Sequence, residues 1–188
     1  LSAMATSASA MIIFLGSTLL KNLKTFLLVT RNITLIFGVS ENTLEFGKAL
    51  EKTGKTAIVY LDPNDETRLH TAIAQTGAII RSDAEALNGS VRFLRSIGLR
   101  PGKRKLFVYA LDRSLLANRE FAKKLVTSLE SRGILPEQTT LTILSSGEET
   151  DNPFQAVSGR YGFGSVLSIN EPDMVARILI QNYPPYQS

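Results

Sequence analysis

Apolar and polar residues follow two alternating patterns along residues 31–188. Short runs that are apolar or β-branched throughout, such as NITLIFGV (32–39), are typical of strands buried on both faces. Longer segments with apolar residues near helical spacing, such as ENTLEFGKALEKTG (41–54), are typical of amphipathic helices. The pattern predicts strands at 32–39, 56–62, 78–82, 104–112, 139–145 and 165–170, and helices at 41–54, 64–77, 83–98, 115–133 and 171–183.

Helices separate most of the predicted strands, and this order favours a parallel sheet. Right-handed crossovers then place helices on both faces. No linker divides the segment, so we predict one doubly wound α/β domain over 31–188, built on a mainly parallel six-stranded sheet. The helix at 83–98 has a weak interior at Asn88 and Gly89. Ten residues are expected in or near the core: Ile33, Ile36, Ile58, Tyr60, Phe107, Tyr109, Leu141, Ile143, Val166 and Leu167.

Residues 1–30 form a separate apolar segment ahead of this domain. Leu1 to Leu20 carry no charge, and Lys21 and Lys24 follow. The length is about that needed to cross a bilayer, and the positive charge after it suits a cytoplasmic end. The alternative is an amphipathic helix, because several apolar side chains fall on one helical face. The segment is therefore either the end of a membrane helix or a dimerisation arm. Because the chain starts with Leu, we expect it to be part of a longer protein.

Composition excludes several kinds of chemistry. The 188-residue chain has no cysteine, which excludes disulfides and thiolate catalysis. A single histidine, His70, argues against a zinc site, because such sites draw on several His or Cys ligands. We therefore expect no metal. The net charge of +4 is spread thinly along the chain, so we expect no nucleic-acid partner.

Basic residues gather on either side of Pro101 and Gly102. This cluster is either a solvated face or a rim that attracts anions, and scattered surface charge favours the first. The residues are Arg92, Arg95, Arg100, Lys103, Arg104 and Lys105.

The first predicted strand ends at a glycine turn that has part of a dinucleotide-binding pattern. Of the three expected glycines only Gly38 is present, and Ser40 and Thr43 occupy the other two positions. Glu41 puts a carboxylate where a pyrophosphate would lie. The amides at the helix start still offer an anion site, and Asn42 with Glu45 fits a capping pair.

Asp62 ends the second predicted strand. An acid at this distance from the glycine turn binds a ribose hydroxyl in dinucleotide sites, and the alternative is an ordinary loop aspartate.

Taken together, the motifs over residues 32–183 resemble the TrkA-N family, the RCK domains that regulate potassium conductance. The stretch 33–62 is similar to the family's first strand, glycine turn, helix and acidic strand end. Asp83 sits where the family has a Gly-Asp pair facing the nucleotide, with Ser82 in place of the glycine. LFVYALDRSLLANREFAKKL matches the family through Ala110, Asp112 and Asn118. GFGSVLSINEPDMVARILI is similar to the family's final strand and helix, and channels of the Castor and Pollux type carry similar diverged domains.

The resemblance implies a Rossmann-like domain at the cytoplasmic face of a membrane, within a longer potassium or cation channel or transport protein. It implies ligand sensing rather than catalysis, pairing into a homodimer or larger assembly, and NAD(H) or another nucleotide bound weakly or no longer bound. The implied nucleotide-contacting residues are Gly38, Asp62, Asp83 and Asp112, beside the departures at Ser40 and Glu41.

Two other functions stay open. One is an NAD(P)-dependent oxidoreductase, which needs a proton-transferring residue in the cleft. Tyr60 and Tyr109 lie within predicted strands and fit that role poorly. The other is a structural dimerisation module that has lost its ligand.

Overall fold

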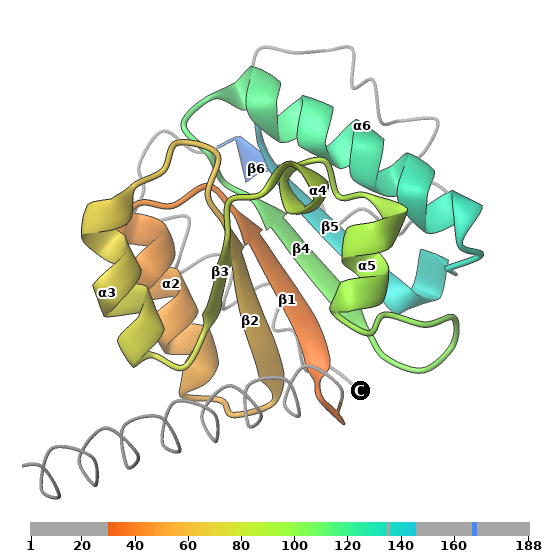
Figure 1. Ribbon diagram of the computed structural model, residues 1–188, viewed down its shortest axis with the longest axis horizontal. Helices are drawn as coiled ribbons and strands as arrows, with labels where there is room; N and C mark the ends of the chain where they lie inside the picture. The colour runs from red at the N-terminus through yellow and green to blue at the C-terminus, as the bar shows by residue number, and fades with distance from the viewer. Residues whose placement is uncertain (1–29, 135, 146–166, 169–188) are drawn as a thin grey trace, which may run out of the picture.

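The structure, a computed structural model, describes residues 30–134, 136–145 and 167–168 (Figure 1). The predictions for the N-terminal segment, for Val166 and for the helix at 171–183 lie outside these residues. Within the described part, no helix is long and apolar enough to qualify as a candidate membrane span.

A parallel sheet forms the centre of the domain (Figure 1). Its strands are β1 (Asn32–Phe37), β2 (Thr56–Leu61), β3 (Ile79–Arg81), β4 (Leu106–Ala110) and β5 (Thr139–Ser145). They lie in the order β3-β2-β1-β4-β5, and all pairs are parallel. The two-residue β6 (Leu167–Ser168) pairs with β5. Among the described residues the sheet therefore has five full strands rather than six, with this two-residue strand at the sixth position.

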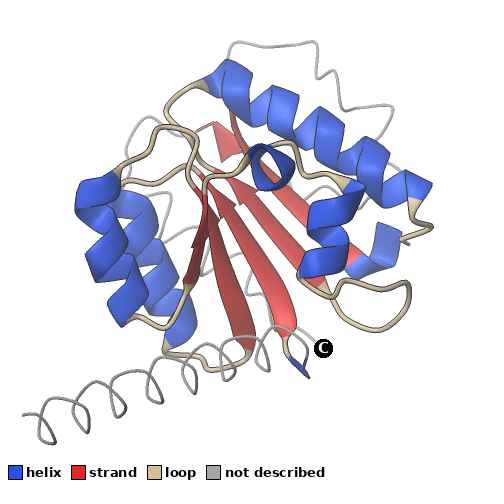
Figure 2. Cartoon of the chain, viewed as in Figure 1, coloured by secondary structure: helices blue, strands red, loops and turns tan. Residues whose placement is uncertain are grey.

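Helices cover both faces of the sheet, as Figure 2 shows. On one side lie α2 (Glu41–Glu51) and α3 (Thr67–Gln75), and on the other lie α4 (Ala84–Leu87), α5 (Val91–Ser96) and α6 (Leu115–Ser131). A short 3-10 helix, η1 (Pro136–Gln138), leads into β5. The doubly wound α/β fold and its parallel sheet are as the hydrophobic pattern predicted.

Alternate residues of each central strand enter two separate cores. In β1, Leu35 and Phe37 pack with the side of α6, where Phe37 stacks on Phe121 at 4.3 Å between ring centroids. Ile36 points the other way and packs with Phe46 and Leu50 of α2. Eight of the ten predicted core residues are buried in one of these clusters.

The helix predicted at 83–98 is two short helices, α4 and α5. The chain breaks at Gly89, which has a φ of +56°. A Cβ there would lie 2.9 Å from Leu125 Cδ1, so α6 packs against the break itself. Positive φ and this close contact both favour glycine, and glycine is a weak helix former. Ser90 then caps α5 by accepting a hydrogen bond from the Phe93 amide.

Candidate functional site

The candidate site lies at the carboxyl ends of three adjacent strands. Gly38 follows β1, Asp62 follows β2, and Asp112 follows β4. In a doubly wound sheet the strand order reverses between β1 and β4, and ligands bind in the crevice beyond this point. The three residues that the sequence singled out therefore converge on the expected position.

The turn at Gly38 needs glycine because another part of the protein comes close to it. Gly38 has a φ of +96°, which side chains disfavour. A Cβ at this position would lie 2.5 Å from Asp112 Cα and 2.6 Å from Asp112 N. The space beside this glycine is thus filled by the backbone after β4.

The start of α2 is capped by its own side chains. Ser40 is the N-cap: its Oγ accepts from the Thr43 amide at 3.2 Å, and Thr43 Oγ1 accepts from the Ser40 amide at 2.9 Å. The predicted pair of Asn42 and Glu45 is wrong, since Glu45 instead forms an ion pair with Lys48 at 2.6 Å. Thr43, at the position of the third glycine, serves as the partner of the cap. Glu41 is exposed in the first turn.

In dinucleotide sites, one of the three glycines lets the helix pack closely on the sheet. Here Gly47 has this role. A Cβ there would lie 1.8 Å from the Tyr60 hydroxyl oxygen, so Tyr60 from β2 passes directly under α2. The Tyr60 hydroxyl donates to the Thr43 carbonyl at 2.9 Å. Burial raises the pKa of Tyr60, and the nearby carboxylates of Glu51 and Glu45 add to the shift. Tyr60 is therefore a neutral structural residue.

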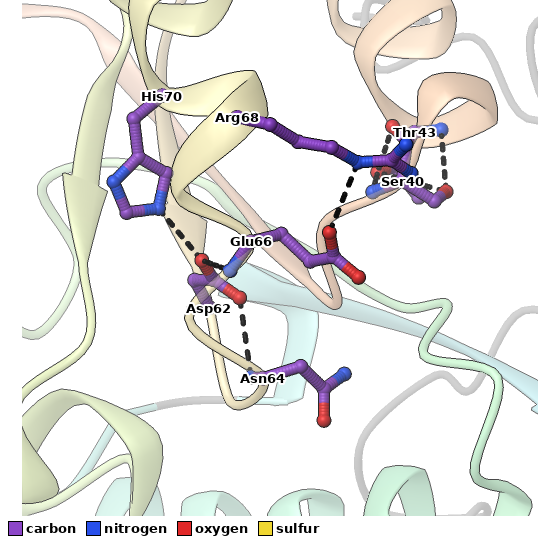
Figure 3. Close-up of polar contacts among 7 residues, drawn as sticks. All are labelled: Ser40, Thr43, Asp62, Asn64, Glu66, Arg68 and His70. Atoms are coloured by element: carbon purple, nitrogen blue, oxygen red, sulfur yellow. Dashed lines mark hydrogen bonds and ion pairs between the residues drawn. The ribbon is translucent and has the colours of Figure 1, made fainter.

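Asp62 is buried, and its carboxylate accepts hydrogen bonds from the loop after β2 and from α3 (Figure 3). Oδ1 accepts from the Asn64 amide at 3.2 Å, and Oδ2 accepts from the Glu66 amide at 2.7 Å. The same Oδ2 lies 2.7 Å from His70 Nε2 of α3. A carboxylate that accepts from three donors fixes the loop, and only part of its accepting capacity is left for a ribose hydroxyl.

Asn64 links this loop to the loop after β4. Its Nδ2 donates to Asp112 Oδ2 at 2.8 Å, a contact between residues 48 positions apart. Asp112 Oδ1 accepts from the Ser114 amide at 2.8 Å. Because β1 lies between β2 and β4 in the sheet, this bond crosses the carboxyl end of β1, where the glycine turn begins.

Asn118 holds the loop after β4 from the other side. The buried Asn118 accepts from the Asp112 amide and donates to the Asp112 carbonyl, both at 2.8 Å. Its side chain thus acts as a local backbone clamp at the start of α6.

Asp83 has a structural role of its own. It caps α4 by accepting from the Ala86 amide at 3.1 Å, and it accepts from Arg81 Nε at 2.6 Å. The Arg81 hydrogen bond is the main cause that lowers the pKa of Asp83. Gly38, Asp62, Asn64 and Asp112 together are called the carboxyl-end network. The contacts of Asp83 stay at the end of β3, so Asp83 is not part of this network.

Sequence reasoning missed Asn64 and gave His70 no role, using it only as an argument against a zinc site. An aspartate that binds its own loop has a recognisable signal, because Asp62 and Asn64 stand two residues apart in DPNDE. His70 stands eight residues after Asp62 and lies inside α3, and no local spacing rule pairs a strand-end aspartate with a histidine at that distance.

The structure also brings Asp62, Asp65 and His70 together, with one ligand atom of each within 4.8 Å of the others. This is the one such group within residues 30–134, 136–145 and 167–168. The Asp62 oxygens already accept three hydrogen bonds, so we assign the group a structural role.

Comparisons with known proteins give little beyond the fold. No protein-family model matches the chain, and no curated protein matches it. Among solved structures, a short-chain dehydrogenase/reductase double mutant from Serratia marcescens is similar, with 13% sequence identity and a TM-score of 0.39. The similarity covers 80% of this chain and 65% of that chain.

The sheet order and the two helical layers by themselves define a Rossmann-like α/β domain. The resemblance to the TrkA-N family stays a prediction.

Proposed function

We propose that this chain is a non-catalytic, ligand-sensing Rossmann-like domain that regulates a cation channel or transport protein. The observation that carries the proposal is the carboxyl-end network, in which the acids expected to hold a dinucleotide bind protein groups instead. A site closed by its own hydrogen bonds suits a sensor, because a ligand that replaces them shifts the protein between two states.

The geometry gives little support to the oxidoreductase alternative. Tyr60 and Tyr109 are 1% and 2% exposed, so neither reaches a substrate. His70 is partly exposed, but its Nε2 is engaged with Asp62. A catalytic acid or base has to reach the atom that it protonates or deprotonates.

The ligand that best fits the site is a nucleotide or nucleoside, with NAD(H) among the candidates. Ser40 occupies the Thr43 amide, which leaves the amides of Glu41 and Asn42 to meet a phosphate at the start of α2. The exposed Glu41 carboxylate opposes a second negative charge there. We therefore expect weak binding, and a preference for ligands with fewer phosphate charges.

We further propose that the domain acts as a homodimer or larger assembly, at the cytoplasmic face of a membrane. RCK-like domains couple their sites by pairing, and a regulatory domain needs a partner to which it transmits the change of state. The resemblance to the TrkA-N family supports this part of the proposal.

Calorimetry on the 188-residue chain tests the site. We expect NAD(H), NADP(H) and ATP to bind weakly, and Asn64→Ala to strengthen binding about fivefold, because a ligand would no longer compete with a hydrogen bond worth about 1 kcal/mol. Asn88→Ala is the matched control, since Asn88 is exposed and bonds Lys124 instead. Low-micromolar NAD(H) binding that Asn64→Ala leaves unchanged, and that Asp62→Ala abolishes, would contradict a closed site.

Ion flux tests the regulatory role. The full-length protein that carries this domain, reconstituted in liposomes, should change its cation flux when the ligand found by calorimetry is added. Turnover of NADH or NADPH with a substrate panel would instead favour the oxidoreductase.

A further inference from the structure

The loops that lead into three neighbouring strands are basic. Because β2, β1 and β4 are adjacent and parallel, the loops before them lie together at one end of the sheet, opposite the carboxyl-end network (Figure 1). We call this the amino end. The loops are residues 30–31, 52–55 and 97–105, and none of them contains an aspartate or a glutamate. Their exposed basic residues, which we call the amino-end surface, are Lys52, Lys55, Arg100, Lys103 and Lys105.

The register of the sheet brings these loops side by side. The first residue of β1, Asn32, is opposite Thr56 of β2, so Arg31 stands beside Lys55 just ahead of the strands. On the other side of β1, the Lys105 amide donates to Asn32 Oδ1 at 3.1 Å. Neighbouring strands lie about 5 Å apart. The basic residues before β2, β1 and β4 are therefore neighbours because of the backbone pairing.

The loop before β4 is held by contacts to its backbone. Gln138 Nε2 donates to the Arg100 carbonyl at 2.6 Å, and Gln138 Oε1 accepts from the Gly102 amide at 2.7 Å. Arg132 Nη2 donates to the Leu99 carbonyl at 2.9 Å. These bonds use main-chain groups of the loop, while Arg100 is exposed to solvent. A surface whose backbone is fixed in advance loses less conformational entropy when it binds.

Acids mark the opposite end of the same strands. Asp62 follows β2, Asp112 follows β4, and Glu41 begins the helix after β1. At the amino end, the exposed acids Glu51 and Glu137 stand at the end of α2 and in η1, outside the three basic loops. The charge of the domain is therefore uneven along the strand direction. An uneven charge orients a protein toward a charged partner.

The sequence ahead of β1 indicates the kind of partner. Residues 1–29 lie outside the described part. In the sequence, Leu1 to Leu20 carry no charge, and Lys21 and Lys24 follow. The chain then enters β1 through Arg31, at the amino end. An uncharged stretch with apolar residues favours a bilayer, and basic residues close to it favour one that contains anionic lipids.

We propose that the amino-end surface docks the domain onto an anionic lipid bilayer, with the carboxyl-end network facing away from it. Each exposed basic side chain near the headgroups adds to the attraction, which falls off within about a Debye length. The inference rests on the proposed membrane location and gives the domain an orientation there. It does not depend on the nucleotide site. Nucleic acid is the other polyanion that a basic surface attracts, but the uncharged stretch joined to this end favours a bilayer.

Flotation of the 188-residue chain with vesicles tests the docking. We expect stronger binding to vesicles of phosphatidylcholine with phosphatidylserine than to phosphatidylcholine alone, where no surface charge attracts the chain. The triple variant Arg100→Gln, Lys103→Gln and Lys105→Gln should weaken binding to the anionic vesicles about tenfold or more. Raising the salt from about 0.1 M to about 0.5 M should weaken binding of the parent in the same direction.

A second triple variant is the matched control. Arg92→Gln, Arg113→Gln and Lys123→Gln remove the same charge from exposed positions outside the amino-end surface. Binding to the anionic vesicles should change much less than in the first variant. Thermal unfolding shows whether both variants are folded, and the first keeps the backbone contacts of the loop before β4.

Site-specific labelling tests the orientation. The chain has no cysteine, so a single introduced cysteine takes up a fluorophore selectively. Thr53→Cys places the label in the loop before β2, and Ser82→Cys places it after β3 at the opposite end. A quencher carried by the lipid headgroups should reach the label at position 53 and spare the label at position 82.

Several outcomes would overturn the docking. These are equal weakening by the two triple variants, equal binding to neutral and anionic vesicles, and equal quenching of the two labels. Tighter binding of a short DNA duplex than of anionic vesicles, lost in the first triple variant, would assign the surface to nucleic acid instead. Failure of nucleotide binding in calorimetry with vesicle binding intact would count against the nucleotide site alone, and the converse result would remove only the docking.

Discussion

The two ends of the sheet handle polar groups in opposite ways. At the carboxyl end, the carboxylates of Asp62 and Asp112 each accept from more than one donor, and Asn64 connects the two loops. At the amino end, Arg132 keeps two donors without an acceptor among the described residues. The conventional ligand position of the fold is therefore closed by the protein itself, while the opposite end holds unmet hydrogen-bonding capacity. Fold position alone does not decide which end binds a ligand, because the hydrogen-bond partners of each polar group matter as well.

The largest expected effect of a substitution at the carboxyl end is that of Gly38→Val. The new Cβ would lie 2.5 Å from the Asp112 backbone, and the φ of +96° is strained for any side chain. We expect the free energy of unfolding to fall by about 4 kcal/mol or more, because backbone atoms cannot move aside cheaply. Urea unfolding followed by circular dichroism measures the loss.

Gly54→Ala is the control for backbone strain without a clash. Gly54 has a φ of +67°, and a Cβ there would meet no neighbouring atom of the described residues within 4 Å. The substitution should cost only about 1 kcal/mol, which is the effect of an unfavourable φ alone. If the two substitutions cost the same, the close contact between Gly38 and Asp112 does not hold the carboxyl end together.

The second prediction concerns Asp62→Ala. Removing this buried carboxylate leaves the Glu66 and Asn64 amides and His70 without their acceptor. We expect a loss of about 3 kcal/mol, in the range for hydrogen bonds to a buried charged group. Asp65→Asn is the control, since Asp65 is an exposed neighbour in the same loop and asparagine tolerates its φ of +52°. Near-equal stability of the Asp62 variant and the parent would mean that the carboxylate is held for a ligand rather than for the fold.

The sequence predicted the scaffold of the carboxyl end but not its closure. The strands were visible because they are apolar on both faces, as the two cores around Leu35 and Ile36 require. Gly38 and Asp62 were singled out at the ends of predicted strands, whereas Asp83 and Asp112 came from the resemblance to the TrkA-N family. The structure brings Asp112 to the other two and leaves Asp83 apart. The hydrogen bond from Asn64 to Asp112 joins distant loops, and no local pattern in the sequence encodes such a contact.

The amino end shows the same limit more strongly. The sequence showed Arg95 and Arg100 as part of a basic run, for which a solvated face was the favoured interpretation. Arg132 lies outside that run, and its burial depends on how α6 packs against the loop before β4. Local charge patterns do not reveal whether a guanidinium has an acceptor, because this depends on tertiary packing.

The third prediction tests the close packing of α2 against Tyr60 of β2. Gly47→Ala places a Cβ 1.8 Å from the Tyr60 hydroxyl oxygen, so we expect a loss of about 2 kcal/mol from overpacking. Tyr60→Phe removes the clashing oxygen, so the double variant should regain part of the lost stability. The free energies from a double-mutant cycle measure this coupling, and simple additivity of the two changes would contradict the contact.

The smallest expected effect is that of Asp83→Asn, which contrasts an outer acid with the buried Asp62. Asparagine still caps α4, so the change mainly removes the charge that pairs with Arg81. The folded-state pKa of Asp83 is lowered, chiefly by the Arg81 hydrogen bond. The ion pair therefore stabilises the protein above the unfolded-state pKa, and this contribution is lost as the pH falls through the folded-state pKa.

Because the pair is solvent-exposed, we expect Asp83→Asn to lower the free energy of unfolding by less than about 0.5 kcal/mol at neutral pH. Melting temperatures of parent and variant should differ slightly at pH 7 and converge as the pH falls below the ordinary aspartate pKa. A difference that grows as the pH falls would show that the Arg81 contact is not the source of the effect.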